Sequence, residues 1–177
     1  IGEYVAACLA GVFSLEHALD LVFTRSRLAK ELAPEGRMLT IMLSEKEVLP
    51  YLNSNQQLFL SVSNGHFFSV VSGSIEAVDN LRKTLLKNSI ACQYLEISRP
   101  FHSPMMEAAS AALTKKAQAI KLNPPEIPYL SNLTGTWITD EQAVDPGYWA
   151  GHLCQTVKFD QGIQELFKKP DQILLEL

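Results

Sequence analysis

The stretch LFLSVSNGHFFSVVSGS, residues 58–74, alternates apolar and polar side chains on both sides of Asn64-Gly65. Alternation with period two is typical of β-strands, and Asn-Gly is a favoured two-residue hairpin turn. The pattern therefore predicts strands over residues 58–63 and 67–72 that pair as a hairpin.

Further elements follow outward from this hairpin. Ser74 offers an N-cap for a helix over residues 75–87, whose apolar residues recur at helical spacing. On the other side, residues 38–43 are a short apolar run, and Ser44 precedes a second helix with Glu at the capping-box position. Residues 91–97 complete the set as a last strand. The order βαββαβ predicts a ferredoxin-like unit of about sixty residues.

Helical patterns flank this unit on both sides. The expected helices cover residues 2–32 (as a pair), 104–120, 145–152 and 159–167, with buried strands over 127–131 and 172–177 and a turn at 134–136. With 177 residues, the chain can form one domain or a domain with a small insert.

The composition excludes several classes of partner. A net charge of −4 without a basic stripe argues against nucleic acid, and no apolar run reaches the roughly 20 residues needed to span a bilayer. The three cysteines form no CxxC pair and no cluster with metal-ligand spacing, so no metal site is expected. Unpaired thiols favour a reducing cytoplasm.

The segment Arg99-Pro100-Phe101-His102-Ser103 lies between a predicted strand and a predicted helix. A histidine on such a turn can present its imidazole in a cleft. By itself, such a histidine is more often simply a polar loop residue. The remaining histidines, His17, His66 and His152, are interpreted as structural.

These residues occur together with others in a known order. The opening Ile1-Gly2-Glu3 resembles the second half of Gly-His-Ser-x-Gly-Glu, the nucleophile-elbow motif of acyl-CoA:acyl carrier protein acyltransferases. Arg25, Phe101-His102-Ser103-Pro104 and residues 152–159 follow in that family's order and approximate spacing. The chain thus resembles the acyltransferase domain of a modular type I polyketide synthase, related to malonyl-CoA:acyl carrier protein transacylases.

The resemblance implies an α/β fold with an α/β-hydrolase-like large subdomain and an inserted ferredoxin-like small subdomain. The large subdomain would comprise residues 1–36 and 98–177, and the small one residues 37–97. It also places the nucleophilic serine immediately before Ile1, so the chain is expected to be a fragment that lacks the N-terminal part of the domain.

The resemblance also assigns roles to individual residues. His102 would be the general base for the serine, the backbone carbonyl of Gln155 would orient its imidazole, and the backbone N–H of Ile1 would donate to the oxyanion. Arg25 would bind the substrate carboxylate, since a guanidinium fork suits a carboxylate. Phe101 would favour malonyl over methylmalonyl units by filling the space that an α-methyl group needs.

The implied reaction moves a malonyl unit from malonyl-CoA to the phosphopantetheine thiol of an acyl carrier protein, with no bound cofactor. Neighbouring ketosynthase and linker domains would be further partners in a cytoplasmic synthase. Three alternatives stay open: a freestanding transacylase of fatty-acid synthesis, an esterase or lipase, and a noncatalytic scaffold domain. A buried Arg25 would argue against the esterase. The identity of the residue before Ile1 would decide between an enzyme, which needs a serine there, and a noncatalytic scaffold domain.

Overall fold

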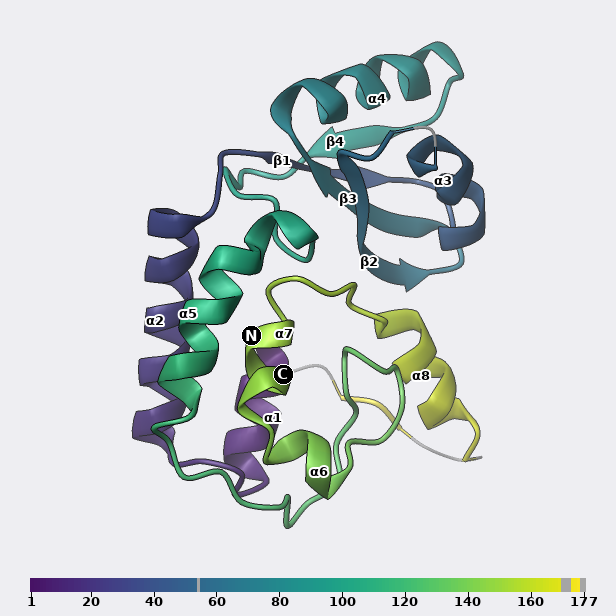
Figure 1. The fold of residues 1–177 in the computed structure, drawn as a ribbon. Coiled ribbons are helices and arrows are strands. Elements are labelled where there is room, and N and C mark those ends of the chain that lie inside the picture. Colours follow the sequence, from purple (N-terminus) through teal and green to yellow (C-terminus); the bar gives the residue numbers. More distant parts are fainter. Residues whose placement is uncertain (54, 170–172, 176–177) are drawn as a thin grey trace.

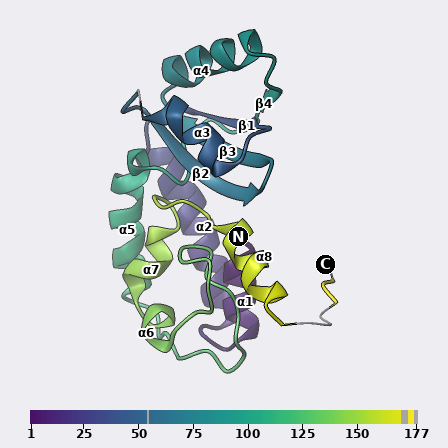
Figure 2. The ribbon, with the colours of Figure 1, turned by 90° about the vertical axis from the view of Figure 1, so that its right-hand side faces the viewer.

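The structure is a computed structural model that describes residues 1–53, 55–169 and 173–175. The described residues pack around two hydrophobic cores. One lies within a small four-stranded sheet and its helices, and the other lies within a group of helices. Figures 1 and 2 show the sheet at one end of the molecule and the helices α1, α2, α5 and α7 at the other.

The small sheet has the predicted ferredoxin-like arrangement. Its elements, in chain order, are β1 (Arg37–Ile41), α3 (Glu45–Leu52), β2 (Leu58–Gly65), β3 (Phe68–Gly73), α4 (Ile75–Lys87) and β4 (Cys92–Tyr94). The strand order is β2-β3-β1-β4, and the neighbouring strands are antiparallel. The prediction of a βαββαβ unit is confirmed.

Alternation along the strands gives the sheet two different faces. Leu39 and Val71 are fully buried and pack with Val78 of α4 in the core beneath the helices. Their neighbours Met38 and Val70 belong to the opposite face, where they line a cavity. One face of the sheet therefore stabilises the unit, and the other is available to a site.

Local sequence signals explain the helix starts in this unit. The hydroxyl of Ser44 accepts from the N–H of Glu47 at 3.3 Å, and the backbone N–H of Ser44 donates to the Glu47 carboxylate at 2.9 Å. The predicted capping box is thus confirmed. Ser74 caps α4 without a capping box: its hydroxyl accepts from the N–H of Ala77 at 3.3 Å.

Two predictions within the small sheet need correction. The hairpin turn lies at residues 66–67 and not at Asn64-Gly65, because register shifts after Leu60 and Ser63 move the end of β2 to Gly65. The strand expected over 91–97 is limited to β4, since the chain turns at Leu95, whose carbonyl accepts from the N–H of Ile97 at 2.8 Å.

Helices dominate the described part of the chain outside the sheet. They are α1 (Gly2–Leu9), α2 (Leu15–Leu32), the 3-10 turn η1 (Pro104–Met106), α5 (Glu107–Ala117), α6 (Asp140–Ala143), α7 (Pro146–Gly151) and α8 (Phe159–Phe167). The predicted N-terminal pair and the helix over 159–167 are confirmed. Leu21, Leu113 and Trp149 are fully buried where these helices pack together.

The predicted strand over residues 127–131 is wrong, since this segment forms only an isolated bridge between Leu130 and Trp137. Pro128 lacks the N–H that a strand interior requires. The predicted strand over 172–177 falls largely outside the described residues, and residues 173–175 form no strand. None of the described helices is long and apolar enough to cross a membrane.

The two cores meet along strand β2. Val62 forms a parallel bridge with Val157, and the hydroxyl of Thr156 donates to the carbonyl of Leu60 at 2.7 Å. The segment before α8 therefore extends the edge of the sheet and holds the cavity-lining face against the helices. The division of the chain at residues 36/37 and 97/98 stays a prediction.

Candidate active site

A cavity of about 430 Å³ lies between the open face of the sheet and the helices. Ile1, Arg25 and His102 line it from the helical side, and Val62 and Val70 line it from the sheet. An adjoining pocket of about 280 Å³ shares these residues and adds Phe101. The structure thus brings together residues that are far apart in the sequence.

His102 lies on a tight turn just before η1. Its backbone has φ of +60°, a left-handed conformation in which histidine is one of the enriched residue types. Its backbone N–H donates to the carbonyl of Leu153 at 2.8 Å. The hydroxyl of the following residue, Ser103, donates to the carbonyl of Pro100 at 2.6 Å. These bonds fix a strained turn, which is a common feature of functional sites.

The surroundings keep the His102 imidazole neutral. Burial, then the positive charge of Arg25, then His152 lower the pKa of His102 to about 4, although a backbone interaction with Gln155 opposes the fall. Its Nδ1 atom is buried without a hydrogen-bond partner among the described residues. A neutral imidazole with an unpaired nitrogen can accept a proton at neutral pH.

Gln155 lies on the loop after α7, next to His102. Both residues line a trough of about 650 Å³. The backbone of Gln155 acts on the imidazole, as the upward contribution to the pKa of His102 indicates. The predicted role of the carbonyl in orienting the ring is compatible with this placement and stays a prediction.

Arg25 is buried on α2, with 8% of its surface exposed. Among the described residues it has no ion pair, its Nε has no hydrogen-bond partner, and its guanidinium lies 5.0 Å from the centre of the Phe101 ring. Burial lowers its pKa. A buried cation without a carboxylate partner is costly, and an anionic ligand in the cavity would compensate it.

Ile1 lies at the start of α1 and lines the same cavity. Its carbonyl accepts from the N–H of Tyr4 at 2.9 Å, so the first turn of the helix begins at this residue. The positive end of a helix dipole favours developing negative charge. The predicted oxyanion role of the Ile1 N–H is compatible with this position and is not tested by it.

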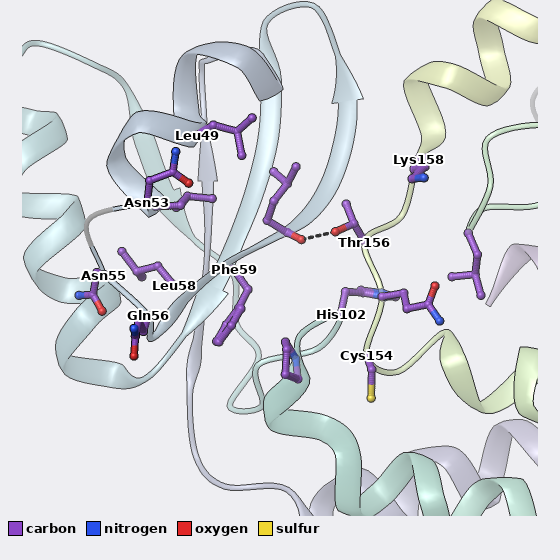
Figure 3. A pocket seen from close by; sticks show the side chains of 15 residues that line it. Leu49, Asn53, Asn55, Gln56, Leu58, Phe59, His102, Cys154, Thr156 and Lys158 are labelled. Atoms are coloured by element: carbon purple, nitrogen blue, oxygen red, sulfur yellow. Dashed lines mark hydrogen bonds between the residues drawn. The ribbon is translucent and has the colours of Figure 1, made fainter.

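His102 lines this trough together with residues of β2 and of the segment before α8 (Figure 3). Leu58 and Phe59 of β2, with Asn55 nearby, lie on one side of His102. Thr156 and Lys158 lie on the other side. The trough mixes apolar and amide side chains and could hold an extended, partly polar chain.

Sequence reasoning missed a group of buried polar residues behind the cavity. Glu3 is 4% exposed, and its carboxylate accepts from the hydroxyl of Tyr148 and from the N–H of Asn132. His152, which the sequence suggested was only structural, is 5% exposed and lines the cavity. Glu3 is the last residue of the stretch that resembles the nucleophile-elbow motif, but nothing in the sequence connects it with its partners, which lie more than 120 positions away.

Similar curated proteins include large polyketide synthases. A phenolphthiocerol/phthiocerol polyketide synthase of Mycobacterium tuberculosis is 34% identical over 176 residues, which are 99% of this chain and 12% of that protein. The spectinabilin polyketide synthase system protein NorB of Streptomyces orinoci is 38% identical over 167 residues, 94% of this chain and 8% of that protein. The chain thus spans a small part of each relative.

Solved structures show the same similarity to polyketide synthases. The acyl transferase domain of SpnD has a TM-score of 0.89 at 34% identity, covering 95% of this chain and 40% of that one. The acyl transferase domain of ZmaA has a TM-score of 0.83 at 41% identity, covering 94% and 38%. These similarities confirm the predicted α/β fold class.

The acyl transferase domain family matches residues 1–177. The match covers the whole chain, including the cavity, the turn at His102 and the buried Arg25. We conclude that this chain belongs to the acyl transferase domain family and is similar to the acyl transferase domains of modular polyketide synthases.

Proposed function

We propose that the chain forms part of an acyltransferase that moves a malonyl unit from malonyl-CoA to the phosphopantetheine thiol of an acyl carrier protein. One observation carries the proposal: a buried guanidinium without an anionic partner among the described residues shares a cavity with a neutral imidazole. The first suits the free carboxylate of a malonyl group, and the second suits a general base.

The reaction would proceed through an acyl-enzyme on the serine expected immediately before Ile1. His102 takes the proton from the serine hydroxyl as its oxygen attacks the thioester carbonyl, and the Ile1 N–H donates to the resulting oxyanion. The C–S bond breaks, and CoA leaves with the proton from His102. The carrier thiol then attacks the ester, His102 takes its proton and returns it to the serine. No resident cofactor is required.

The trough beside His102 would admit the phosphopantetheine arm. His102 lines it, and Asn53, Asn55 and Gln56 line it beside apolar residues. Such a lining suits a chain of alternating amide and methylene groups. CoA and the carrier protein would therefore use the same entrance in turn.

Two observations support a malonyl-type substrate. The Phe101 ring packs against Arg25 and narrows the space around the carboxylate site. The SpnD domain was solved in complex with a 2-(pent-4-yn-1-yl)malonyl group, which has the same acid function. Because the two curated relatives are polyketide synthases, we propose an acyl carrier protein, a ketosynthase and linker domains as partners.

Intact-protein mass spectrometry of the complete domain tests the proposal. After brief exposure to malonyl-CoA, methylmalonyl-CoA and acetyl-CoA in parallel, we expect a malonyl adduct on the serine that precedes Ile1. A preference for acetyl-CoA would reject the carboxylate-binding role of Arg25. Absence of an adduct with all three thioesters would favour a noncatalytic scaffold.

A further inference from the structure

A buried carboxylate outside the proposed chemistry connects the two sides of the site. Glu3 belongs to α1, the helix that begins at the cavity, and its side chain points into the helical core. Its Oε2 atom accepts from the backbone N–H of Asn132 at 2.7 Å. Its Oε1 atom accepts from the hydroxyl of Tyr148 and lies 3.4 Å from Nε2 of His152, which makes no hydrogen bond among the described residues. Both carboxylate oxygens are therefore engaged.

The partners of Glu3 are themselves held in place. The hydroxyl of Tyr148 lies 2.6 Å from Oγ of Ser131, which accepts from the N–H groups of Leu133 and Thr134. The ring of His152 stacks on Trp149, with an angle of 17° between the planes. Burial, followed by the charge of Glu3, raises the pKa of Tyr148 well above its ordinary range, so this phenol stays protonated as a donor.

This network ends at the residues that hold His102. His152 precedes Leu153, whose carbonyl accepts from the N–H of His102 at 2.8 Å. The same loop continues to Gln155, whose backbone acts on the imidazole. In the other direction, Glu3 lies in the first turn of the helix that starts at Ile1. One carboxylate thus connects the predicted oxyanion donor with the loop that supports the predicted base.

We propose that Glu3 is a positioning residue for the acyl transfer. It fixes the start of α1 relative to the loop at 153–155, and so fixes the distance between the nucleophile and His102. Small displacements of reacting groups reduce rates strongly. Because Glu3 does not reach the trough or Arg25, its loss should slow the chemical step without weakening substrate binding. The inference rests on the proposed acyl-enzyme reaction.

The chain offers a matched pair of tyrosines for the test. Tyr148→Phe removes a buried hydroxyl that donates to Glu3. Tyr129→Phe removes a buried hydroxyl that has no hydrogen-bond partner among the described residues. Glu3→Gln keeps the side-chain shape and an acceptor for Asn132 but removes the charge. All three variants would be made in the complete domain and checked for folding by circular dichroism.

Rapid-quench mass spectrometry with malonyl-CoA would give the acylation rate constant and the KM of each variant. We expect Glu3→Gln and Tyr148→Phe to lower the rate constant at least about tenfold with KM within about twofold, and Tyr129→Phe to change neither. Rates within about twofold of the parent for Glu3→Gln would overturn the inference while leaving the proposed function intact. Equal losses in both tyrosine variants would also overturn it. A parent domain that forms no acyl-enzyme would overturn both.

Discussion

Arg25→Met removes a guanidinium that is 8% exposed and replaces it with an unbranched apolar side chain that adapts to irregular space. A malonyl carboxylate held by the guanidinium fork would accept two charge-assisted hydrogen bonds, each contributing about 1.5–3 kcal/mol. Their loss corresponds to a fall of about 10²–10⁴-fold in kcat/KM for malonyl-CoA. Acetyl-CoA has no free carboxylate, so its kcat/KM should change by less than about threefold.

The same substitution should stabilise the ligand-free domain. Arg25 has no ion pair among the described residues, and its burial already disfavours the charged form, as its lowered pKa shows. Contact with the Phe101 ring at 5.0 Å recovers only about 0.5–2 kcal/mol. Desolvation of a buried unpaired ion costs several kcal/mol. We therefore expect the free energy of unfolding to rise by about 1–3 kcal/mol.

Two assays separate these effects: acyl-enzyme formation with malonyl-CoA and acetyl-CoA, and urea unfolding without ligand. Arg27→Met is the matched control, because Arg27 lies on the same helix and is exposed. Arg27→Met should change neither the ratio of kcat/KM for malonyl-CoA to that for acetyl-CoA nor the free energy of unfolding. Equal losses with both thioesters, or a less stable free domain, would refute the reasoning and show that Arg25 supports the fold.

Further predictions concern His102, Phe101 and Ser44. His102→Gln should lower the acylation rate by about 10²–10⁴-fold, whereas the same change at exposed His66 should not. In the parent domain, kcat/KM should fall on the acid side near pH 4, which is the pKa of His102. A fall near pH 6.5 would contradict the burial of the His102 imidazole. The His102 imidazole is protonated near pH 6.5 in the unfolded chain and near pH 4 in the folded chain. Above pH 6.5 it is neutral in both states, so it does not change the free energy of unfolding there. Urea titrations should show a loss of up to about 3 kcal/mol as the pH falls to 4. Phe101→Ala should raise the ratio of methylmalonyl to malonyl adduct by about 10–100-fold; an unchanged ratio would reject its role in selectivity. Ser44→Ala should lower the free energy of unfolding by about 1 kcal/mol, and a similar loss from exposed Ser26→Ala would indicate that the cap is not the cause.

Local patterns predicted the small sheet well, because its order depends on neighbours in sequence. The capping box at Ser44 and the period-two strands around residues 58–72 contain their own structural signal. Prediction failed where a distant contact decides the backbone. The segment 127–131 reads as an apolar strand, yet its backbone groups bond across the turn to residues 135–138, and the N–H of the next residue, Asn132, donates to Glu3.

Only the residues that belong to recognisable motifs could be predicted for the site. The order of the motifs along the chain identifies His102 and Arg25, and the structure places both in one cavity. The Glu3–Tyr148 contact joins residues 145 positions apart, and no spacing rule connects them. A lone histidine near a helix end is usually structural, so the sequence gives His152 no other role. Its burial beside the cavity depends on aromatic packing that only the folded chain creates.

Arg25 and His102 act on each other through the cavity they share, and substrate should change this coupling. Burial is the main cause that lowers the pKa of His102, and the charge of Arg25 is the second. The carboxylate of malonyl-CoA bound to Arg25 would offset much of that charge, so the pKa of His102 should rise in the complex. A base is most effective when its pKa is close to the ambient pH. Binding of the malonyl carboxylate would therefore make His102 a more effective base for the attack on the thioester of the same substrate. Since kcat/KM reports the free enzyme and kcat the complex, we expect the acid limb of kcat at higher pH than that of kcat/KM with malonyl-CoA. With acetyl-CoA the two limbs should coincide, and coincidence for both substrates would mean that the two residues are uncoupled.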